Sequence, residues 1–310
     1  MLDTHNRGSL WNKTRQRLDI QVATSELAEF LNRDKFVSQE EPILEMGDWP
    51  RLSVIVPSFN QGRYLERTIL SILNQAYPNL ELIVIDGGST DSSLNVLQQY
   101  DQFIAHWVSE KDNGQAHAIN KGMAISTGEW LSFQNSDDLY LPGALRSVGL
   151  AVKANPNSDV IIGHVVGMNQ GDEVTGAMLV MPPSFWRQIS VGILFHNQAT
   201  FWRRSITKRL GEFREDLRFA LDYEYFTRIL QNNFKVTLLD RYLGAFRYHP
   251  MSKSSTISHI GMSEHKAVVK GIQNNLRGNY RAFLPAIMGK AVKAIWCLLT
   301  GRGWYLFRQR

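Results

Sequence analysis

Hydrophobic and polar positions alternate along residues 52–239 with two different spacings. Short β-branched runs such as residues 52–57 predict buried strands, whereas Leu65, Ile69 and Leu73 recur at helical spacing and predict a helix over residues 62–75. The same reasoning predicts strands at residues 80–85, 104–108, 130–133, 159–166, 198–202 and 235–239, and helices at residues 92–100, 115–125 and 222–231. Strands that alternate with helices build a mostly parallel sheet with right-handed crossovers. The pattern therefore predicts an α/β domain over residues 51–250.

The two ends of the chain differ from this middle part. Residues 1–50 form a polar N-terminal extension in which we expect one weakly amphipathic helix at residues 25–36. Residues 251–310 begin as a polar loop and continue as a basic and aromatic tail, in which one side of an expected helix gathers Leu284, Ile287, Met288, Ala291, Ile295, Leu298 and Leu299. Two interpretations stay open: residues 284–310 contact an anionic membrane surface, or this helix packs on the main domain.

Composition narrows the class of protein. The hydrophobic fraction of 44% and the charged fraction of 20% are typical of a folded domain. The net charge of +5 suits an anionic partner, but a mildly basic enzyme without one fits equally. Much of the positive charge lies in the tail and no base-reading module is visible, so we expect no nucleic-acid partner.

Cysteine content and hydropathy bear on the compartment. The single cysteine, Cys297, excludes an intrachain disulfide and a cysteine-rich metal cluster. The first residues lack the apolar core of a secretory signal, and no run approaches the roughly 18 apolar residues of a membrane span. We therefore expect a cytoplasmic protein.

Polar residues follow four of the expected strands, in residues 58–60, 86–91, 110–114 and 135–138. Such residues are also common in turns and helix caps, which would account for any one of these loops. Carboxyl ends of parallel strands meet at one edge of a sheet, where ligands bind. Four such loops together predict a binding site at that edge.

Six motifs occur in a fixed order: residues 54–60 (VIVPSFN), 85–91 (IDGGSTD), 112–114 (DNG), 118–122 (AINKG), 135–138 (NSDD) and 219–224 (FALDYE). In this order the chain resembles the family 2 glycosyltransferases, over roughly residues 52–249. The resemblance implies the GT-A fold, a single α/β domain with a mostly parallel central sheet, here followed by a helical C-terminal tail. It also implies a nucleotide-sugar half at residues 51–145 and an acceptor half at residues 146–250.

The resemblance further implies a nucleotide-sugar donor, usually a UDP-sugar. Nucleotide contacts are implied for Pro57, Ser58, Asn60, Asp86, Asp112, Asn120, Lys121 and Asp137. A base and a ribose offer N–H and O–H donors, which carboxylate and amide oxygens accept. This chain has Gly87 where the family often has a second aspartate, so the identity of the base stays open.

Asp137 and Asp138 match the metal-binding motif of the family, and His249 is implied as a further ligand. The expected cofactor is Mn²⁺ or Mg²⁺, which would offset charge on the leaving diphosphate, and the imidazole favours Mn²⁺. Asn135 replaces the usual first aspartate of the motif. Metal binding is not the only interpretation of these residues: the two aspartates could lie in a solvated turn, and the histidine in a solvated loop. Among the nearby cations, Lys253 is the most promising phosphate partner.

Asp222 matches the catalytic base of the family, with Glu224 as the second choice. A single base opposite the leaving diphosphate implies an inverting transfer to an acceptor hydroxyl. Asp222 also stands where an aspartate caps a helix, which is the structural alternative. Residues 196–198 (HNQ) resemble the loop that faces the acceptor. We expect the acceptor to be a glycan or a lipid-linked molecule, in synthesis of cell-surface polysaccharide or glycolipid. If the tail at residues 284–310 contacts lipid, the enzyme would be a cytoplasmic protein bound peripherally at the inner face of the membrane.

The sequence also bears on three other functions. A Rossmann dehydrogenase needs Gly-x-Gly-x-x-Gly after the first strand, and residues 58–62 lack that spacing. A sugar nucleotidyltransferase would need a loop rich in glycine and arginine at the same place, and residues 58–62 do not have that composition. A non-catalytic nucleotide-sugar-binding protein on the same fold stays open, because Gly87 and Asn135 depart from the family pattern.

Overall fold

The computed structural model describes residues 20–23, 47–275 and 295 of the chain. The helix predicted at residues 25–36 and, apart from Ile295, the tail at residues 284–310 lie outside the described residues. None of the helices in the described part has the length and apolar character needed to span a bilayer. The division into an extension, a main domain with two halves, and a tail stays a prediction.

Four parallel strands form the centre of the sheet, in the order β4-β3-β2-β5. Their bounds are β2 (Leu52–Ser58), β3 (Leu80–Asp86), β4 (His106–Ser109) and β5 (Trp130–Phe133). Each strand matches its predicted range to within about two residues. Because the four strands are parallel, their carboxyl ends lie at one edge of the sheet. The predicted α/β class is confirmed.

The sheet continues through strands of both directions. Beyond β5 it runs β9-β7-β8-β1, and β10 pairs with β7 in parallel and with the short β6 in antiparallel fashion. These strands are β1 (Gln21–Val22), β6 (Leu139–Tyr140), β7 (Val160–Met168), β8 (Glu173–Met178), β9 (Thr200–Arg203) and β10 (Val236–Arg247). β9 is antiparallel to both of its neighbours, β5 and β7. The second half of the sheet is therefore mixed.

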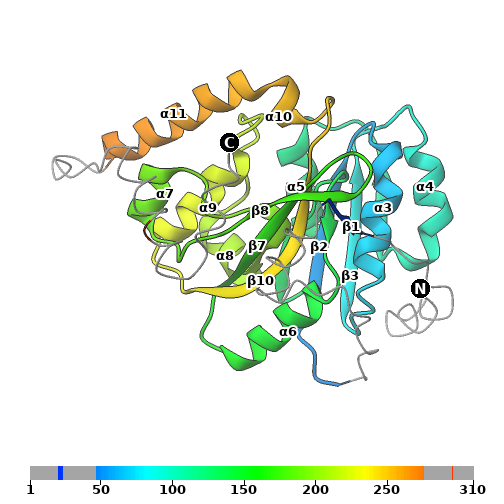
Figure 1. Cartoon of the computed structure of the whole chain (residues 1–310), viewed down its shortest axis with the longest axis horizontal. Helices are drawn as coiled ribbons and strands as arrows, with labels where there is room; N and C mark the ends of the chain where they lie inside the picture. The colour runs from blue at the N-terminus through cyan, green and yellow to red at the C-terminus, as the bar shows by residue number, and fades with distance from the viewer. Residues whose placement is uncertain (1–19, 24–46, 276–294, 296–310) are drawn as a thin grey trace.

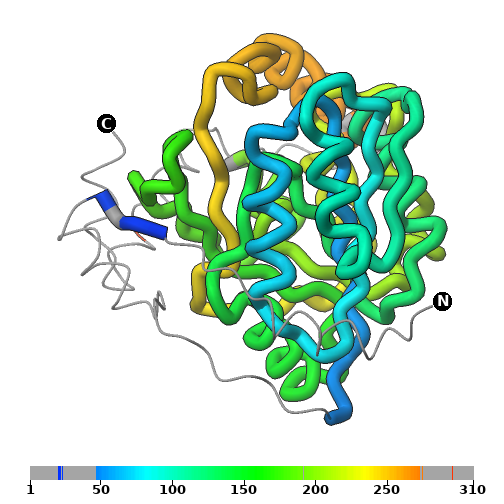
Figure 2. Tube along the Cα trace, turned by 90° about the vertical axis from the view of Figure 1, so that its right-hand side faces the viewer, coloured from blue at the N-terminus to red at the C-terminus, as the bar shows by residue number. Residues whose placement is uncertain are grey.

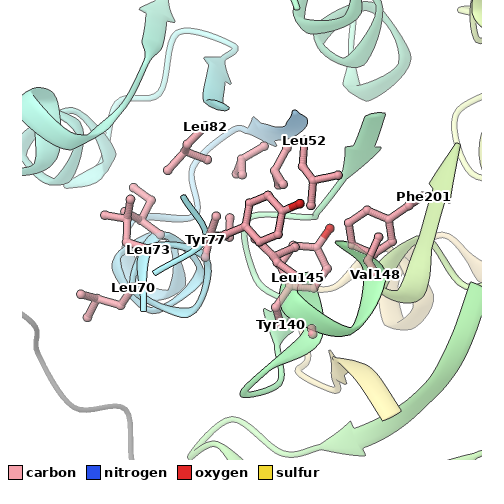
Figure 3. Close-up of a cluster of buried hydrophobic side chains, with 14 of the residues drawn as sticks. Leu52, Leu70, Leu73, Tyr77, Leu82, Tyr140, Leu145, Val148 and Phe201 are labelled. Atoms are coloured by element: carbon pink, nitrogen blue, oxygen red, sulfur yellow. The ribbon is translucent and has the colours of Figure 1, made fainter. Parts of the chain in front are cut away.

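Helices cover both faces of the sheet, giving three layers (Figure 1). All seven residues of β2 are buried, and alternate side chains point to opposite faces. Val54 packs with α3 (Gly62–Leu73), α4 (Ser93–Tyr100) and α6 (Ala144–Ala154). Ile55 packs on the other face with α5 (Gln115–Ile125), α8 (Arg204–Leu210) and α9 (Leu221–Gln231). Figure 3 shows part of the first cluster, including Leu52, Leu70, Leu73, Leu82, Leu145 and Phe201.

The segment after β10 differs from the predicted polar loop. It contains the short helix α10 (Lys253–Thr256) and the long helix α11 (Ser258–Asn275). Val268 of α11 is buried in the same cluster as Ile229 of α9, so α11 packs on the main domain. Figures 1 and 2 both show α11 at one end of the molecule. Sequence patterns also missed the short elements α7 (Phe185–Val191), α8, β6 and β8.

Candidate active site

A cavity of about 770 Å³ opens at the carboxyl ends of the central strands. The strand ends contribute Pro57, Ser58, Gly87, Asp112 and Asp137 to its wall. The facing wall comes from the second half of the chain and includes Glu215, Arg218, Phe246 and Lys253. The four predicted loops therefore lie together at one edge of the sheet, as the parallel order of β4-β3-β2-β5 requires.

Two of the predicted nucleotide contacts hold neighbouring loops together instead of lining the cavity. The Asp86 carboxylate is buried and accepts hydrogen bonds from Ser89 N (2.8 Å), Ser89 Oγ (2.5 Å) and Ser109 Oγ (2.7 Å). Asn60 Oδ1 accepts from Thr90 N at 2.9 Å. Neither residue lines the cavity, so this arrangement does not support their predicted contact with the nucleotide. Both residues give the cavity wall its shape.

Ser58 and Asp112 do face the cavity. Ser58 Oγ is buried, and within the described part of the chain no hydrogen-bond partner is found for it. A buried hydroxyl without a partner is costly, but because this oxygen is buried, Ser58 reaches the cavity with other atoms. Asp112 Oδ1 accepts from Gly114 N at 2.8 Å, while Oδ2 lies 2.9 Å from where a Cβ on Gly87 would be. The Asp112 carboxylate thus occupies the space that a side chain at position 87 would need.

Asn120 and Lys121 have other partners in this arrangement, which does not support their predicted contact with the nucleotide. The Asn120 amide accepts from Phe213 N (2.9 Å) and donates to Phe213 O (2.9 Å) and Glu215 Oε1 (3.1 Å). It therefore fixes α5 to the loop that carries Glu215. Lys121 Nζ lies 2.7 Å from Glu110 Oε1. Neither residue lines the cavity.

Asp137 and His249 form the pair best placed to bind a metal ion. Asp137 Oδ2 lies 2.9 Å from His249 Nε2, and Asp137 lines the cavity, whereas His249 is buried directly behind it. The His249 ring packs on the Tyr64 ring, with 4.7 Å between the centroids. Arg247 Nε donates to Asp137 O at 2.7 Å, and its guanidinium lies 4.9 Å from the centre of the same Tyr64 ring. These contacts fix the orientation of the pair.

Asp138, the second predicted metal ligand, points away from the cavity. Its buried carboxylate accepts from Gln198 Nε2 (2.7 Å), Arg247 N (2.8 Å) and Asn135 Nδ2 (2.9 Å). Burial and the neighbouring Asp137 carboxylate raise the pKa of Asp138. In this arrangement Asp138 joins the loop after β5 to β10 and to the loop at Gln198, and it does not line the cavity.

The protein supplies two donor atoms of the kind that a divalent ion accepts. Among the described residues there is no cluster of three or more His, Cys, Asp or Glu side chains that could hold a metal. The carboxylate oxygen of Asp137 suits Mg²⁺ or Mn²⁺, and the imidazole nitrogen of His249 favours Mn²⁺. The donor set therefore fits a weakly held ion that needs further ligands from the substrate or water.

Asn135 belongs to a chain of side-chain hydrogen bonds across the cavity floor. Lys253 Nζ donates to Gln115 Oε1 (2.6 Å), Gln115 Nε2 donates to Asn135 Oδ1 (2.6 Å), and Asn135 Nδ2 donates to Asp138 (2.9 Å). An amide can accept at one end and donate at the other, whereas a carboxylate can only accept. The asparagine that departs from the family pattern is thus the residue this chain of contacts requires.

Replacing Asn135 with Asp tests that explanation. We expect Asn135→Asp to lower the free energy of unfolding by about 1–3 kcal/mol, because the new carboxyl group faces Asp138 and a buried hydrogen bond is lost. Chemical denaturation measures the change. Asn113→Asp is the matched control, since Asn113 lines the same cavity but is exposed. Equal stability of the two variants would contradict the explanation.

Asp222 lies in the first turn of α9, four residues after Arg218 of the cavity wall. It does not itself line the cavity and is partly accessible. Loss of hydration raises the pKa of its carboxyl to about 6, although backbone N–H groups and Lys253 act in the opposite direction. Lys253 is reachable from the cavity, yet loss of hydration lowers the pKa of its ammonium to about 8, with Asp222 opposing the shift. The two groups therefore interact electrostatically.

The second choice for a base, Glu224, is not available in this arrangement. Glu224 is buried, and its carboxylate lies 2.9 Å from Arg228 Nε. Sequence patterns instead missed Gln115, Glu215 and Arg218, which line the cavity. Gln115 directly follows the DNG motif, and that position was the one available signal. The other two lie in a stretch without a regular pattern.

Comparisons with known proteins agree on one family. Residues 53–214, more than half of the chain, match the family model described as "Glycosyl transferase family 2". A "PGL/p-HBAD biosynthesis glycosyltransferase" from Mycobacterium bovis is 29% identical over 194 residues, which cover 61% of this chain and 73% of the relative. The same name and the same figures apply to a protein from Mycobacterium tuberculosis.

Solved structures share the fold. TarS residues 1–349 from S. aureus, crystallised in complex with UDP-GlcNAc, align with a TM-score of 0.58 and 20% identity, covering 79% of this chain and 71% of that one. The mannosyltransferase PcManGT from Pyrobaculum calidifontis, in complex with GDP-Man and Mn²⁺, aligns with a TM-score of 0.51 and 18% identity over 98% of this chain and 97% of that one. At these identities the likeness concerns the fold.

Proposed function

The chain belongs to glycosyl transferase family 2, and we propose that it transfers a sugar from a nucleoside diphosphate sugar to an acceptor hydroxyl, with inversion and with the help of a divalent metal ion. One observation carries this proposal. The cavity at the carboxyl edge of the sheet is lined by Asp137, which contacts His249, and by Lys253, whose ammonium interacts with Asp222. This arrangement brings a proposed metal ligand and a cation suited to a diphosphate close to the proposed base.

The donor is proposed to lie along the strand ends. Both Ser58 and Asp112 line the cavity, and the Asp112 carboxylate suits the hydroxyl and N–H groups of a nucleoside. A UDP-sugar is the first candidate, and the related folds crystallised with UDP-GlcNAc and with GDP-Man support a nucleoside diphosphate sugar in general. Lys253 would pair with the diphosphate through its ammonium group.

The metal is proposed to be Mn²⁺ or Mg²⁺, held by Asp137 and His249. When bound, such an ion offsets the negative charge that develops on the leaving diphosphate. The protein orients the two ligands through Arg247, which binds the Asp137 carbonyl, and through Tyr64, which packs against the imidazole. A fold relative crystallised with Mn²⁺ supports this assignment.

Asp222 is proposed to take the proton of the acceptor hydroxyl as its oxygen attacks the anomeric carbon. Its raised pKa leaves it ionised at neutral pH but basic enough to accept a proton. Contacts between a base and its substrate are often completed only when the substrates are bound, which suits a carboxylate just beyond the cavity wall. A single base on the side opposite the diphosphate gives inversion.

The pH dependence of the reaction follows from these two groups. Asp222 must be ionised, so kcat should fall about tenfold per pH unit below about pH 6. Lys253 must be protonated to pair with the diphosphate, so kcat should also fall above about pH 8. Initial rates between pH 4.5 and 9.5 at saturating donor measure this profile. A rate that is constant from pH 4.5 to pH 7 would contradict the assignment of Asp222.

A donor panel tests the function itself. The protein is incubated with Mn²⁺, with UDP-, GDP- and dTDP-sugars in turn and with simple glycan or lipid-linked acceptors, and nucleotide release is measured. We expect release with one nucleotide only, and its loss on chelation of the metal. Tight binding of a nucleotide with no release, even with acceptor present, would support the non-catalytic alternative. Gly87 and Asn135 no longer favour that alternative, because local contacts explain both residues.

The acceptor and the cellular setting remain proposals. We propose a glycan or lipid-linked acceptor, a role in cell-surface polysaccharide or glycolipid synthesis, and a place at the inner face of the membrane. The proposed contact of residues 284–310 with anionic lipid concerns residues that, apart from Ile295, lie outside the described part of the chain.

A further inference from the structure

The three residues that precede α9 are held by a glutamate far along the chain. Glu264 Oε1 accepts from Arg218 N, and Glu264 Oε2 accepts from Phe219 N and Ala220 N, each at 2.9 Å. Ala220, the residue at the helix start, offers no side-chain cap of its own. These N–H groups belong to the loop that leads into the helix, and a carboxylate is well suited to accept from several of them. Glu264 of α11 therefore fixes the backbone that leads into the helix carrying Asp222.

The backbone of this segment is also held from the opposite side. Arg218 O accepts a hydrogen bond from Lys253 Nζ at 2.9 Å, and the same ammonium binds Gln115 of the cavity floor. The position of Lys253 thus depends on where the 218–220 segment lies. Lys253 and Asp222, the two groups proposed to act in the reaction, are anchored on one short piece of backbone.

Helix α11 fits tightly against this piece of backbone. A Cβ added to Gly261 would lie 2.4 Å from the Phe219 ring, so only glycine allows this approach. The His265 ring lies 3.7 Å from the Tyr223 ring, measured between centroids, and Val268 is buried in the core beneath. Burial would raise the pKa of Glu264, but hydrogen bonds from the 218–220 backbone hold it below its usual value, so the Glu264 carboxylate is charged at neutral pH.

We propose that Glu264 is a positioning residue for sugar transfer, which fixes the 218–220 backbone and through it Asp222, whereas Lys253 keeps its second partner, Gln115. The proposal rests on the proposed function, and it makes α11 part of the catalytic apparatus. An error of about 1 Å in the position of a reacting group can cost about 10²-fold in rate. Glu264 lies outside the cavity, so donor affinity should depend on it far less than turnover does.

The test compares Glu264→Gln and Glu264→Ala with Lys266→Ala, a matched control at an exposed position of α11. We expect kcat to fall about tenfold in the Gln variant, which keeps one acceptor oxygen, and about 10²-fold in the Ala variant, with donor Kd within about twofold of wild type. The control should keep wild-type values. In a protein that already carries Asp222→Asn, adding Glu264→Gln should lower kcat only slightly further. Equal kcat losses in both backgrounds, or a donor Kd that rises as much as kcat falls, would overturn the proposal.

Hydrogen–deuterium exchange separates this proposal from the proposed function. Amides of residues 218–222 should exchange at least tenfold faster in Glu264→Gln, with the rest of the described chain unchanged. Unchanged exchange at residues 218–222 would overturn the positioning role of Glu264, whether or not sugar transfer is detected. Absence of transfer by the wild-type protein would contradict the proposed function alone. Gly261→Ala provides a second variant without loss of charge. It should increase exchange in the same segment by pushing Phe219 away.

Discussion

Asp222→Asn should lower kcat by about 10²- to 10⁴-fold and leave donor Kd within about twofold of wild type. The amide keeps the size of the side chain but cannot take the acceptor proton at neutral pH. Asp222 lies outside the donor side of the cavity, so nucleotide binding should persist. Product formation at saturating donor measures kcat, and titration calorimetry with the nucleotide measures Kd.

Glu215→Gln is the matched control for that prediction. Glu215 is the carboxylate that the second half of the chain places directly on the cavity wall, and it is exposed there. If Asp222 is the base, Glu215→Gln should affect acceptor KM more than kcat. A loss of kcat in Glu215→Gln with Asp222→Asn nearly fully active would show that the base has been assigned to the wrong residue.

Asp137→Asn and His249→Ala should each lower kcat/KM by about 10²- to 10³-fold, which corresponds to about 3–4 kcal/mol of lost charge stabilisation. Each substitution removes one of the two donors that the protein offers to the ion. The Mn²⁺ concentration needed for half-maximal rate should rise in parallel. Rates measured across a Mn²⁺ titration give both quantities.

Asp138→Asn separates metal binding from support of the fold. The buried Asp138 carboxylate accepts three hydrogen bonds and does not line the cavity. Its replacement should therefore lower the free energy of unfolding by about 1–3 kcal/mol while the half-maximal Mn²⁺ concentration changes little. If Asp138→Asn instead abolished the response to Mn²⁺ at unchanged stability, Asp138 would be a ligand and the orientation described above would be wrong.

The first half of the fold could be predicted because its hydrophobic pattern is regular. In β2 every residue is buried, and α3, which follows it, carries a clear apolar face, so strand and helix differ plainly. The second half could not be predicted as well. β6 has two residues and α8 has seven, too few for a period to show. α11 begins within a polar stretch, and its place depends on packing against α9 that no local pattern reveals.

The candidate site was predicted by residue type more reliably than by role. Asp86 and Asp137 are both aspartates after parallel strands, yet one is buried among loop hydrogen bonds and the other faces the cavity. A single sequence cannot separate these roles, because turns and ligand sites use the same side chains. The contact between Lys253 and Gln115 joins residues 138 positions apart, so only the folded chain reveals it.

The most direct test is a crystal structure with Mn²⁺ and a nucleoside diphosphate, with diffraction recorded at the manganese absorption edge. We predict an anomalous peak within about 2.3 Å of an Asp137 oxygen and of His249 Nε2, with the diphosphate between this ion and Lys253. A peak elsewhere, or a nucleotide bound away from the carboxyl edge of β2 and β3, would contradict the proposed metal-assisted transfer.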